Sequence, residues 1–177
     1  MTKILYCIRH GTAMHNILYK TMGSQAYYKF RDTPLTNEGL IDAVNLNTVW
    51  KEKNKIDLIV VSPLSRTLRT CDIIFKNANI PTIVLDELKE YPQSGQIVNH
   101  RQNKTILKKL YPDFDFSNII SNKDCNWSEE ELSKNINIER LKNQITKFKK
   151  WIKQRPENKI AVVGHSSYLN MMINGII

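Results

Sequence analysis

The sequence lacks the features that mark several common classes of protein. No apolar run approaches the roughly 18 residues of a membrane span, so we expect no membrane segment. The first apolar stretch, Ile4–Ile8, is too short for the core of a signal peptide and leads directly into Arg9. The three cysteines are few and widely spaced, which argues against a disulfide framework and against a zinc cluster. These absences predict a protein of the reducing cytoplasm.

Acidic residues are also scarce relative to basic ones. The chain has 17 Asp and Glu against 26 Lys and Arg, which gives a formal net charge of +9. Such a surplus favours anionic partners, among them phosphorylated small molecules, phosphoproteins and nucleic acids. The positive charges are spread along the chain, with one concentration at Lys142 to Arg155, so charge alone does not select among these partners.

The chain has no internal repeat and no low-complexity linker, and its length fits a single domain over residues 1–177. Four short segments rich in β-branched residues are predicted to be buried strands: Lys3–Arg9, Asp57–Ser62, Pro81–Leu85 and Lys159–Gly164. Their apolar residues are continuous rather than alternating, which is typical of strands covered on both faces. Because helical patterns lie between them, the predicted fold class is α/β, a three-layer α/β/α domain with a mostly parallel central sheet.

Local signals predict where some helices begin and which residues are buried. Thr36 can cap a helix that carries Leu40, Ile41 and Val44 on one apolar face. Ser128 and Glu131 match a capping box ahead of a long helical region that ends before Pro156. Among the cysteines, Cys7 and Cys71 lie in apolar surroundings and are predicted to be small core residues.

In open parallel sheets, ligands bind beyond the carboxyl ends of the strands. The segments that follow the predicted strands are Arg9-His10-Gly11, Ser62–Arg66, Asp86–Glu90 and Gly164-His165-Ser166. Two histidines, two arginines and a carboxylate therefore converge on one edge of the sheet. This combination is typical of a phosphate-binding site.

The same segments resemble the motifs of a known family. In chain order they are Ile8–Gly11 with His15-Asn16, then Asp32–Gly39 in the pattern D-x-P-L-T-x-x-G, then Ser62–Thr70 in the pattern S-P-L-x-R-x-x-x-T, and finally Val162–His165. An R-H-G triplet alone is weak evidence, but four motifs in order, each at a predicted strand end or helix start, are specific. Over most of its length the chain resembles the histidine phosphatase superfamily, the phosphoglycerate mutase-like group.

The resemblance implies a role for each polar residue of the motifs. His10 would be the nucleophile, rather than a histidine that merely bonds to a backbone carbonyl. Arg9 and Arg66 would hold the phosphoryl group and stabilise its charge in the transition state. His165 would be a further phosphate ligand, and Asn16 would donate to a phosphate oxygen.

Two further assignments stay open. The leaving oxygen needs a proton, and Glu90 in Leu88-Lys89-Glu90 resembles the general acid of the family, with Glu87 as a competitor. The element Asn99-His100-Arg101 resembles a substrate loop of one branch, which makes Arg101 a candidate substrate contact. A solvated surface arginine is the alternative for that residue.

Together these residues predict a phosphatase that hydrolyses phosphomonoesters through a phosphohistidine on His10, without a metal or a cofactor. Its substrate would be a phosphorylated small molecule or a phosphoprotein; we do not expect nucleic acid as a partner, and monomer and homodimer both stay open. One alternative is a phosphoglycerate-type phosphomutase. The short chain argues against it, and its excursion before the last strand is shorter than in the glycolytic mutases that resemble it. Another is a non-catalytic module that binds phosphate or nucleic acid, against which the presence of both histidines and both arginines argues.

Overall fold

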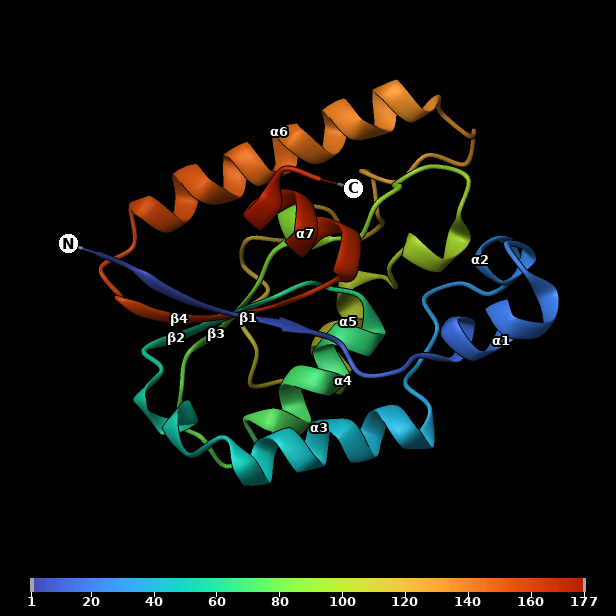
Figure 1. Ribbon diagram of the computed structural model, residues 1–177. Coiled ribbons are helices and arrows are strands. Elements are labelled where there is room, and N and C mark those ends of the chain that lie inside the picture. Colours follow the sequence, from blue (N-terminus) through green and yellow to red (C-terminus); the bar gives the residue numbers. More distant parts are fainter. Residues whose placement is uncertain (1, 177) are drawn as a thin grey trace.

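The computed structural model describes residues 2–176 and contains a parallel sheet between two layers of helices (Figure 1). The strands are β1 (Ile4–Arg9), β2 (Leu58–Val61), β3 (Thr82–Val84) and β4 (Lys159–Gly164), in the spatial order β1-β4-β2-β3. The helices are α1 (Met14–Met22), α2 (Gln25–Lys29), α3 (Asn37–Val49), α4 (Ser65–Ile74), α5 (Lys104–Leu110), α6 (Lys134–Lys153) and α7 (Ser166–Asn174). Within residues 2–176, none of these helices combines the length and apolarity needed to cross a membrane.

The interior strand β2 shows why the strands are continuously apolar. Leu58 and Val60 pack into one core with α6 and α7, whereas Ile59 and Val61 pack into a second core with α3 and α4. Figure 1 shows these two helical layers on opposite faces of the sheet. The predicted three-layer α/β fold with a parallel sheet is therefore confirmed.

Helix α3 begins where predicted but buries a different face. The Thr36 hydroxyl accepts a hydrogen bond from the Gly39 N–H at 3.2 Å, which confirms the cap. Ile41 and Val44, however, are 58% and 52% exposed, so the predicted apolar face is wrong. The buried positions are Gly39 and Ala43, because small residues allow the helix to approach the segment after β1 closely.

Helix α6 begins later than the predicted capping box. Its N-cap is Ser133, whose hydroxyl accepts from the Ile136 N–H. Ser128 instead pairs with a neighbouring extended segment, where its N–H donates to the Gln93 carbonyl and its carbonyl accepts from the Gly95 N–H. Because both backbone groups of Ser128 are used in this pairing, the residue cannot begin a helix.

The two cysteines predicted to be core residues differ in their surroundings. Cys71 is buried on α4, and this burial raises the pKa of its thiol. Cys7 is exposed, so its assignment to the core is wrong. The reason is that β1 is an edge strand and is flanked by another strand on one side alone.

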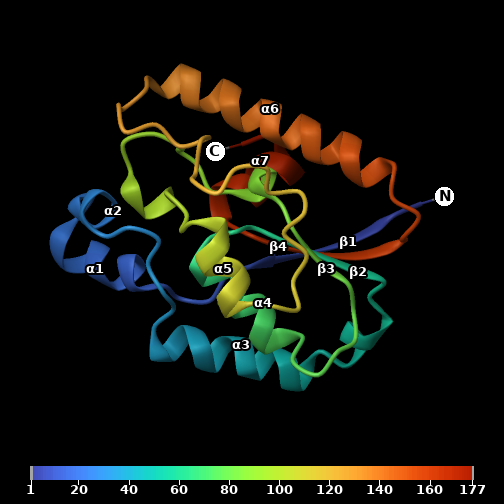
Figure 2. The same cartoon turned by 180° about the vertical axis from the view of Figure 1, so that it is seen from behind.

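The register of the sheet places the two predicted active-site histidines side by side. Arg9 of β1 pairs with Gly164 of β4, so the next residues, His10 and His165, leave the sheet at the same level. Helices α1 and α2 lie beyond this edge, as both views show (Figures 1 and 2). The carboxyl ends of the strands and these two short helices together frame the candidate site.

Candidate active site

A cavity of about 300 Å³ lies at the carboxyl edge of the sheet. Its lining contains five of the predicted site residues: Arg9, His10, Asn16, Arg66 and Glu90. His165 is fully buried beside them, and its ring centroid is 5.2 Å from that of His10. The structure thus brings together every predicted site residue except Arg101.

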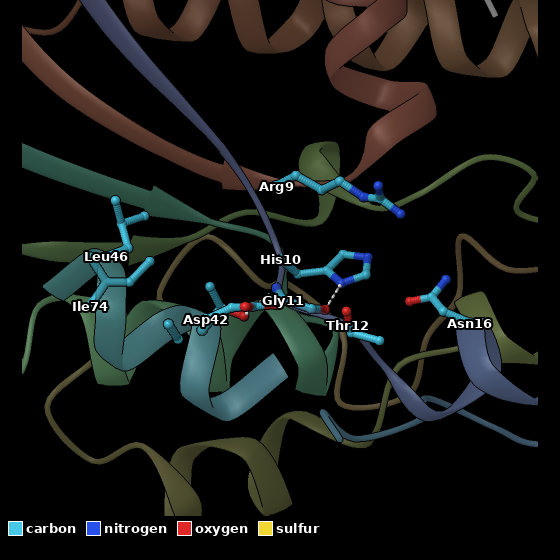
Figure 3. A pocket seen from close by; sticks show the side chains of 10 residues that line it. Arg9, His10, Gly11, Thr12, Asn16, Asp42, Leu46 and Ile74 are labelled. Carbon is cyan, nitrogen blue, oxygen red and sulfur yellow. Dashed lines mark hydrogen bonds between the residues drawn. The ribbon is translucent and has the colours of Figure 1, made fainter. Parts of the chain in front are cut away.

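The hydrogen bond of His10 determines which ring nitrogen is available for chemistry. Its Nδ1 lies 2.7 Å from the Gly11 carbonyl oxygen, the contact drawn as a dashed line in Figure 3. Because a carbonyl oxygen can only accept, Nδ1 carries the proton. In the neutral imidazole, Nε2 therefore carries the free lone pair, which is the state that a nucleophile requires.

Burial lowers the pKa of His10 well below its ordinary value, and the positive charges of Arg66 and Arg9 act in the same direction. The bond to Gly11 opposes this effect but does not outweigh it. The imidazole is therefore neutral at physiological pH.

Arg66 is held rigidly beside His10. It is 1% exposed, and its two terminal nitrogens donate to the Val98 carbonyl at 3.0 Å and to the Asn99 side-chain oxygen at 2.9 Å. The Asn99 amide in turn donates to the Pro92 carbonyl. Among the described residues, the buried Arg66 Nε has no hydrogen-bond partner.

Arg9 and Asn16 complete the part of the site around His10. Figure 3 shows their side chains on the same side of the chain as the His10 ring. The Asn16 side-chain oxygen accepts from the Ala13 N–H at 2.9 Å, which leaves the amide hydrogens as donors. A second cavity of about 360 Å³ lies against α3 and α4, and Arg9, His10 and Asn16 line it as well (Figure 3).

The structure distinguishes between the two candidate acids. Glu90 lines the cavity with His10, and its carboxylate accepts hydrogen bonds from the N–H groups of Tyr91, Ser167 and Tyr168. Burial raises its pKa, against the opposing effects of these N–H groups and of the Arg66 charge. Glu87 lines two other cavities, next to Lys147, and does not line this one.

The His165 ring is fixed on one side by the residue that follows β2. Its Nε2 lies 2.8 Å from the Ser62 hydroxyl, and its buried Nδ1 has no partner within residues 2–176. Burial lowers the pKa of His165 well below its ordinary value, and the Arg66 charge lowers it further. A phosphate dianion would oppose both effects, because it favours the protonated ring.

The loop after β1 is positioned by a contact between two glycines. A Cβ on Gly11 would lie 2.4 Å from the Gly39 carbonyl oxygen, and a Cβ on Gly39 would lie 2.2 Å from the Thr12 carbonyl oxygen. That Thr12 oxygen accepts from both the N–H and the hydroxyl of Thr36. Hydrogen atoms at the two glycine positions therefore allow α3 to lock the His10 loop in place.

Arg101 does not line the cavity and is not exposed to solvent. It is therefore neither a substrate contact nor a surface residue, the two alternatives that the sequence left open. It is fully buried and pairs with Asp86 at 2.9 Å. Its remaining donors bond to backbone carbonyl oxygens of Ser121, Asn122, Lys123 and Gln102. With its guanidinium fully used, Arg101 holds the excursion between β3 and α6 together.

Several residues that line the cavity were not among the predicted site residues, although His15 and Asn99 lie within the sequence motifs. They are His15, Tyr27, Gln96, Asn99 and Ser167. His15 is buried, its Nδ1 bonds to the Thr33 hydroxyl, and burial together with Arg66 and Arg9 lowers its pKa to about 3. Because α2 and the loop around Gln96 have no motif of their own, no local pattern could place them at the site.

Comparison with known proteins identifies one family for this chain. A sequence model described as histidine phosphatase superfamily (branch 1) matches residues 5–177. A phosphoglycerate mutase-like protein of Arabidopsis thaliana is 25% identical, over 97% of this chain and 74% of its own length. An uncharacterized phosphatase of Bacillus subtilis is 27% identical, over 96% of this chain and 75% of its own length.

Solved structures share the fold. The α-ribazole phosphatase of Shigella flexneri superposes with a TM-score of 0.61 at 20% identity, over 96% of this chain and 77% of that protein. The phosphoserine phosphatase of Entamoeba histolytica, solved with 3-phosphoglyceric acid, superposes with a TM-score of 0.59 at 23% identity, over 99% of this chain and 79% of that protein. At these identities the likeness concerns the fold.

Proposed function

This chain belongs to the histidine phosphatase superfamily, and from that premise we propose that it hydrolyses phosphomonoesters through a phosphohistidine on His10. The observation that carries the proposal is the bond from His10 Nδ1 to the Gly11 carbonyl, which leaves the Nε2 lone pair in a cavity shared with two arginines and Glu90. Phosphatases among its structural neighbours support the same reaction class.

In the first step, Nε2 of His10 attacks phosphorus as the bond from phosphorus to the leaving oxygen breaks. The leaving oxygen takes the proton of Glu90, whose raised pKa favours the protonated form. Arg9 and Arg66, which both line the cavity, neutralise the phosphoryl oxygens. The Gly11 carbonyl stabilises the positive charge of the phosphorylated ring through the Nδ1 proton.

In the second step, a water molecule attacks the phosphohistidine and the bond from phosphorus to Nε2 breaks. The Glu90 carboxylate accepts the proton of that water, which restores the acid for the next turnover. His10 returns to its neutral form with the proton still on Nδ1. Both arginines hold the phosphoryl group throughout, so neither step requires a metal ion.

A phosphomutase is the second candidate, because relatives of this chain are called phosphoglycerate mutase-like. The two reactions share the first step and differ in what accepts the phosphoryl group from His10. A second substrate oxygen takes it in a mutase, and water takes it in a phosphatase. Turnover of 3-phosphoglycerate, followed by whether isomer or inorganic phosphate accumulates, separates the two.

The proposal is tested by trapping the intermediate. Quenching with alkaline detergent during turnover of a ³²P-labelled ester should leave label on the protein that is stable to alkali and released by acid. His10→Ala should show no label and should lose several orders of magnitude in kcat, because it removes the nucleophile. Hydrolysis should persist in EDTA. Label on His165 or His15, or activity that EDTA abolishes and a divalent cation restores, would contradict the mechanism.

A further inference from the structure

The positive charges in the cavity are concentrated around the phosphoryl position. Arg9 directly precedes His10, and Arg66 is fixed beside it. His10 and His15 add no charge, because burial and the arginines keep both neutral. Among residues 2–176, no lysine and no third arginine lines this cavity, although the chain has 26 basic residues.

The wall beyond the phosphoryl position is aromatic and uncharged. Tyr27 contacts the ring of His15 edge to face, with centroids 5.8 Å apart, and stacks on Tyr19 at 5.4 Å. Tyr91 and Gln96 line the same cavity from the excursion after β3. A leaving group would therefore meet aromatic faces, a hydroxyl group and an amide.

A negative charge lies close to this uncharged wall. The Tyr28 hydroxyl donates to the Glu131 carboxylate at 2.9 Å. Glu131 also packs over Gly95, where an added Cβ would lie 3.0 Å from its own Cβ. Tyr28 and Gly95 are the sequence neighbours of Tyr27 and Gln96, both of which line the cavity. The Tyr28 hydroxyl also interacts with the Gln96 side chain, so the Glu131 carboxylate lies close to the part of the cavity wall that Gln96 forms.

We propose that this cavity selects phosphomonoesters whose leaving group is uncharged and disfavours those that carry a carboxylate, such as phosphoglycerate or phosphoserine. The inference rests on the proposed phosphatase function and specifies its substrate class. A carboxylate on the leaving group would lie near the Glu131 carboxylate and would find no cation of its own in the cavity lining, and a desolvated charge without a partner is costly. An uncharged hydroxylated or aromatic group packs on Tyr27 and bonds to Gln96 without that cost.

Two matched esters test this selectivity. Glycerol 3-phosphate and 3-phosphoglycerate share a three-carbon skeleton and differ in a terminal CH₂OH against a carboxylate. We expect kcat/KM to favour glycerol 3-phosphate by about tenfold or more, as for one unfavourable charge in a partly desolvated site. Each ester is also measured as a competitive inhibitor of aryl phosphate hydrolysis, so that slow departure of an alkoxide does not hide a difference in binding.

Variants at Gln96 and Glu131 assign the selectivity to its cause. Gln96→Arg supplies the missing cation and should shift the ratio of the two esters toward 3-phosphoglycerate by about fivefold or more, whereas the uncharged Gln96→Met should keep the preference. Glu131→Gln should shift the ratio in the same direction as Gln96→Arg and keeps the effect measurable if the arginine variant folds poorly.

Equal turnover and equal inhibition by the two esters, or a preference for 3-phosphoglycerate, would overturn the inference. A protein that hydrolyses nothing, yet binds glycerol 3-phosphate more tightly in a calorimetric titration, would contradict the phosphatase function and support the selectivity.

Discussion

Replacing Glu90 with glutamine should separate phosphate esters according to how readily their leaving groups depart. An alkoxide needs a proton to leave, and a positioned general acid contributes about 10²–10⁴ in rate. A nitrophenolate leaves without a proton. Glu90→Gln should therefore slow an alkyl phosphate by that factor and slow nitrophenyl phosphate by about tenfold at most.

The hydrogen bonds of Glu90 show what the substitution costs in stability. One carboxylate oxygen accepts from the N–H groups of Tyr91 and Tyr168, and the other accepts from Ser167. Glutamine can keep the first oxygen but places an amide NH₂ opposite the Ser167 N–H. One hydrogen bond is lost, at about 1–3 kcal/mol of unfolding free energy. Two controls show whether the variant keeps its fold and its site: its melting temperature and its affinity for inorganic phosphate.

The pH dependence provides a second measurement of the same group. The raised pKa of Glu90 keeps it protonated to a higher pH than an ordinary glutamate. For an alkyl ester, kcat/KM should fall as pH rises through this pKa, because the acid is lost. At acid pH, kcat/KM should fall again below the lowered pKa of His10, because the protonated ring has no lone pair for attack. Glu90→Gln should remove the alkaline limb and keep the acid limb.

Glu87→Gln is the matched control, since that residue lines other cavities. It should leave the rates on both classes of ester and both pH limbs unchanged. Equal slowing of alkyl and aryl esters in the Glu90 variant would refute its role as the acid. A dependence on the leaving group in the Glu87 variant would assign that role to Glu87 instead.

Two further substitutions test the scaffold of the site. Gly39→Ala would place a methyl group 2.2 Å from the Thr12 oxygen and should lower the free energy of unfolding by about 1–3 kcal/mol in chemical denaturation. Gly164→Ala is the control, because its added methyl group would have its nearest contact at 3.6 Å and should cost less. Equal losses in the two variants would contradict the packing argument. Arg101→Met leaves Asp86 and several carbonyl groups without their buried donor, and should cost about 3–5 kcal/mol. A raised KM at unchanged stability would instead make Arg101 a substrate contact.

The sheet and its site were predictable because both depend on local patterns and one general rule. Short apolar segments identified all four strands, to within one residue at every end. The rule that ligands bind at the carboxyl ends then brought His10, Arg66 and His165 together without knowledge of the strand order. The order adds the detail that β4 lies directly beside β1, which sets the two histidine rings 5.2 Å apart.

The failures concern residues whose environment is set by distant segments. Ser128 fits a helix start locally, but its pairing with Gln93 determines its backbone conformation. Arg101 fits a motif, but Asp86 and the carbonyls around Asn122 hold its guanidinium away from the cavity. On α3, Ile41 and Val44 are apolar and exposed, because the contact of Gly39 with Thr12 decides which face is turned inward. In each case the sequence pattern is sound and a long-range contact outweighs it.

The motif from Asp32 to Gly39 shows how a sequence signature can be functional without lining the site. The Asp32 carboxylate accepts from the N–H and hydroxyl of Ser65, at 2.7 and 2.8 Å, and so fixes the start of α4 one residue before Arg66. Gly39 fixes the loop that carries His10. The motif therefore sets the distance between the nucleophile and the arginine that stabilises the phosphoryl charge. Because such catalysis depends on positions held to a fraction of an ångström, the signature is a constraint on geometry rather than on chemistry.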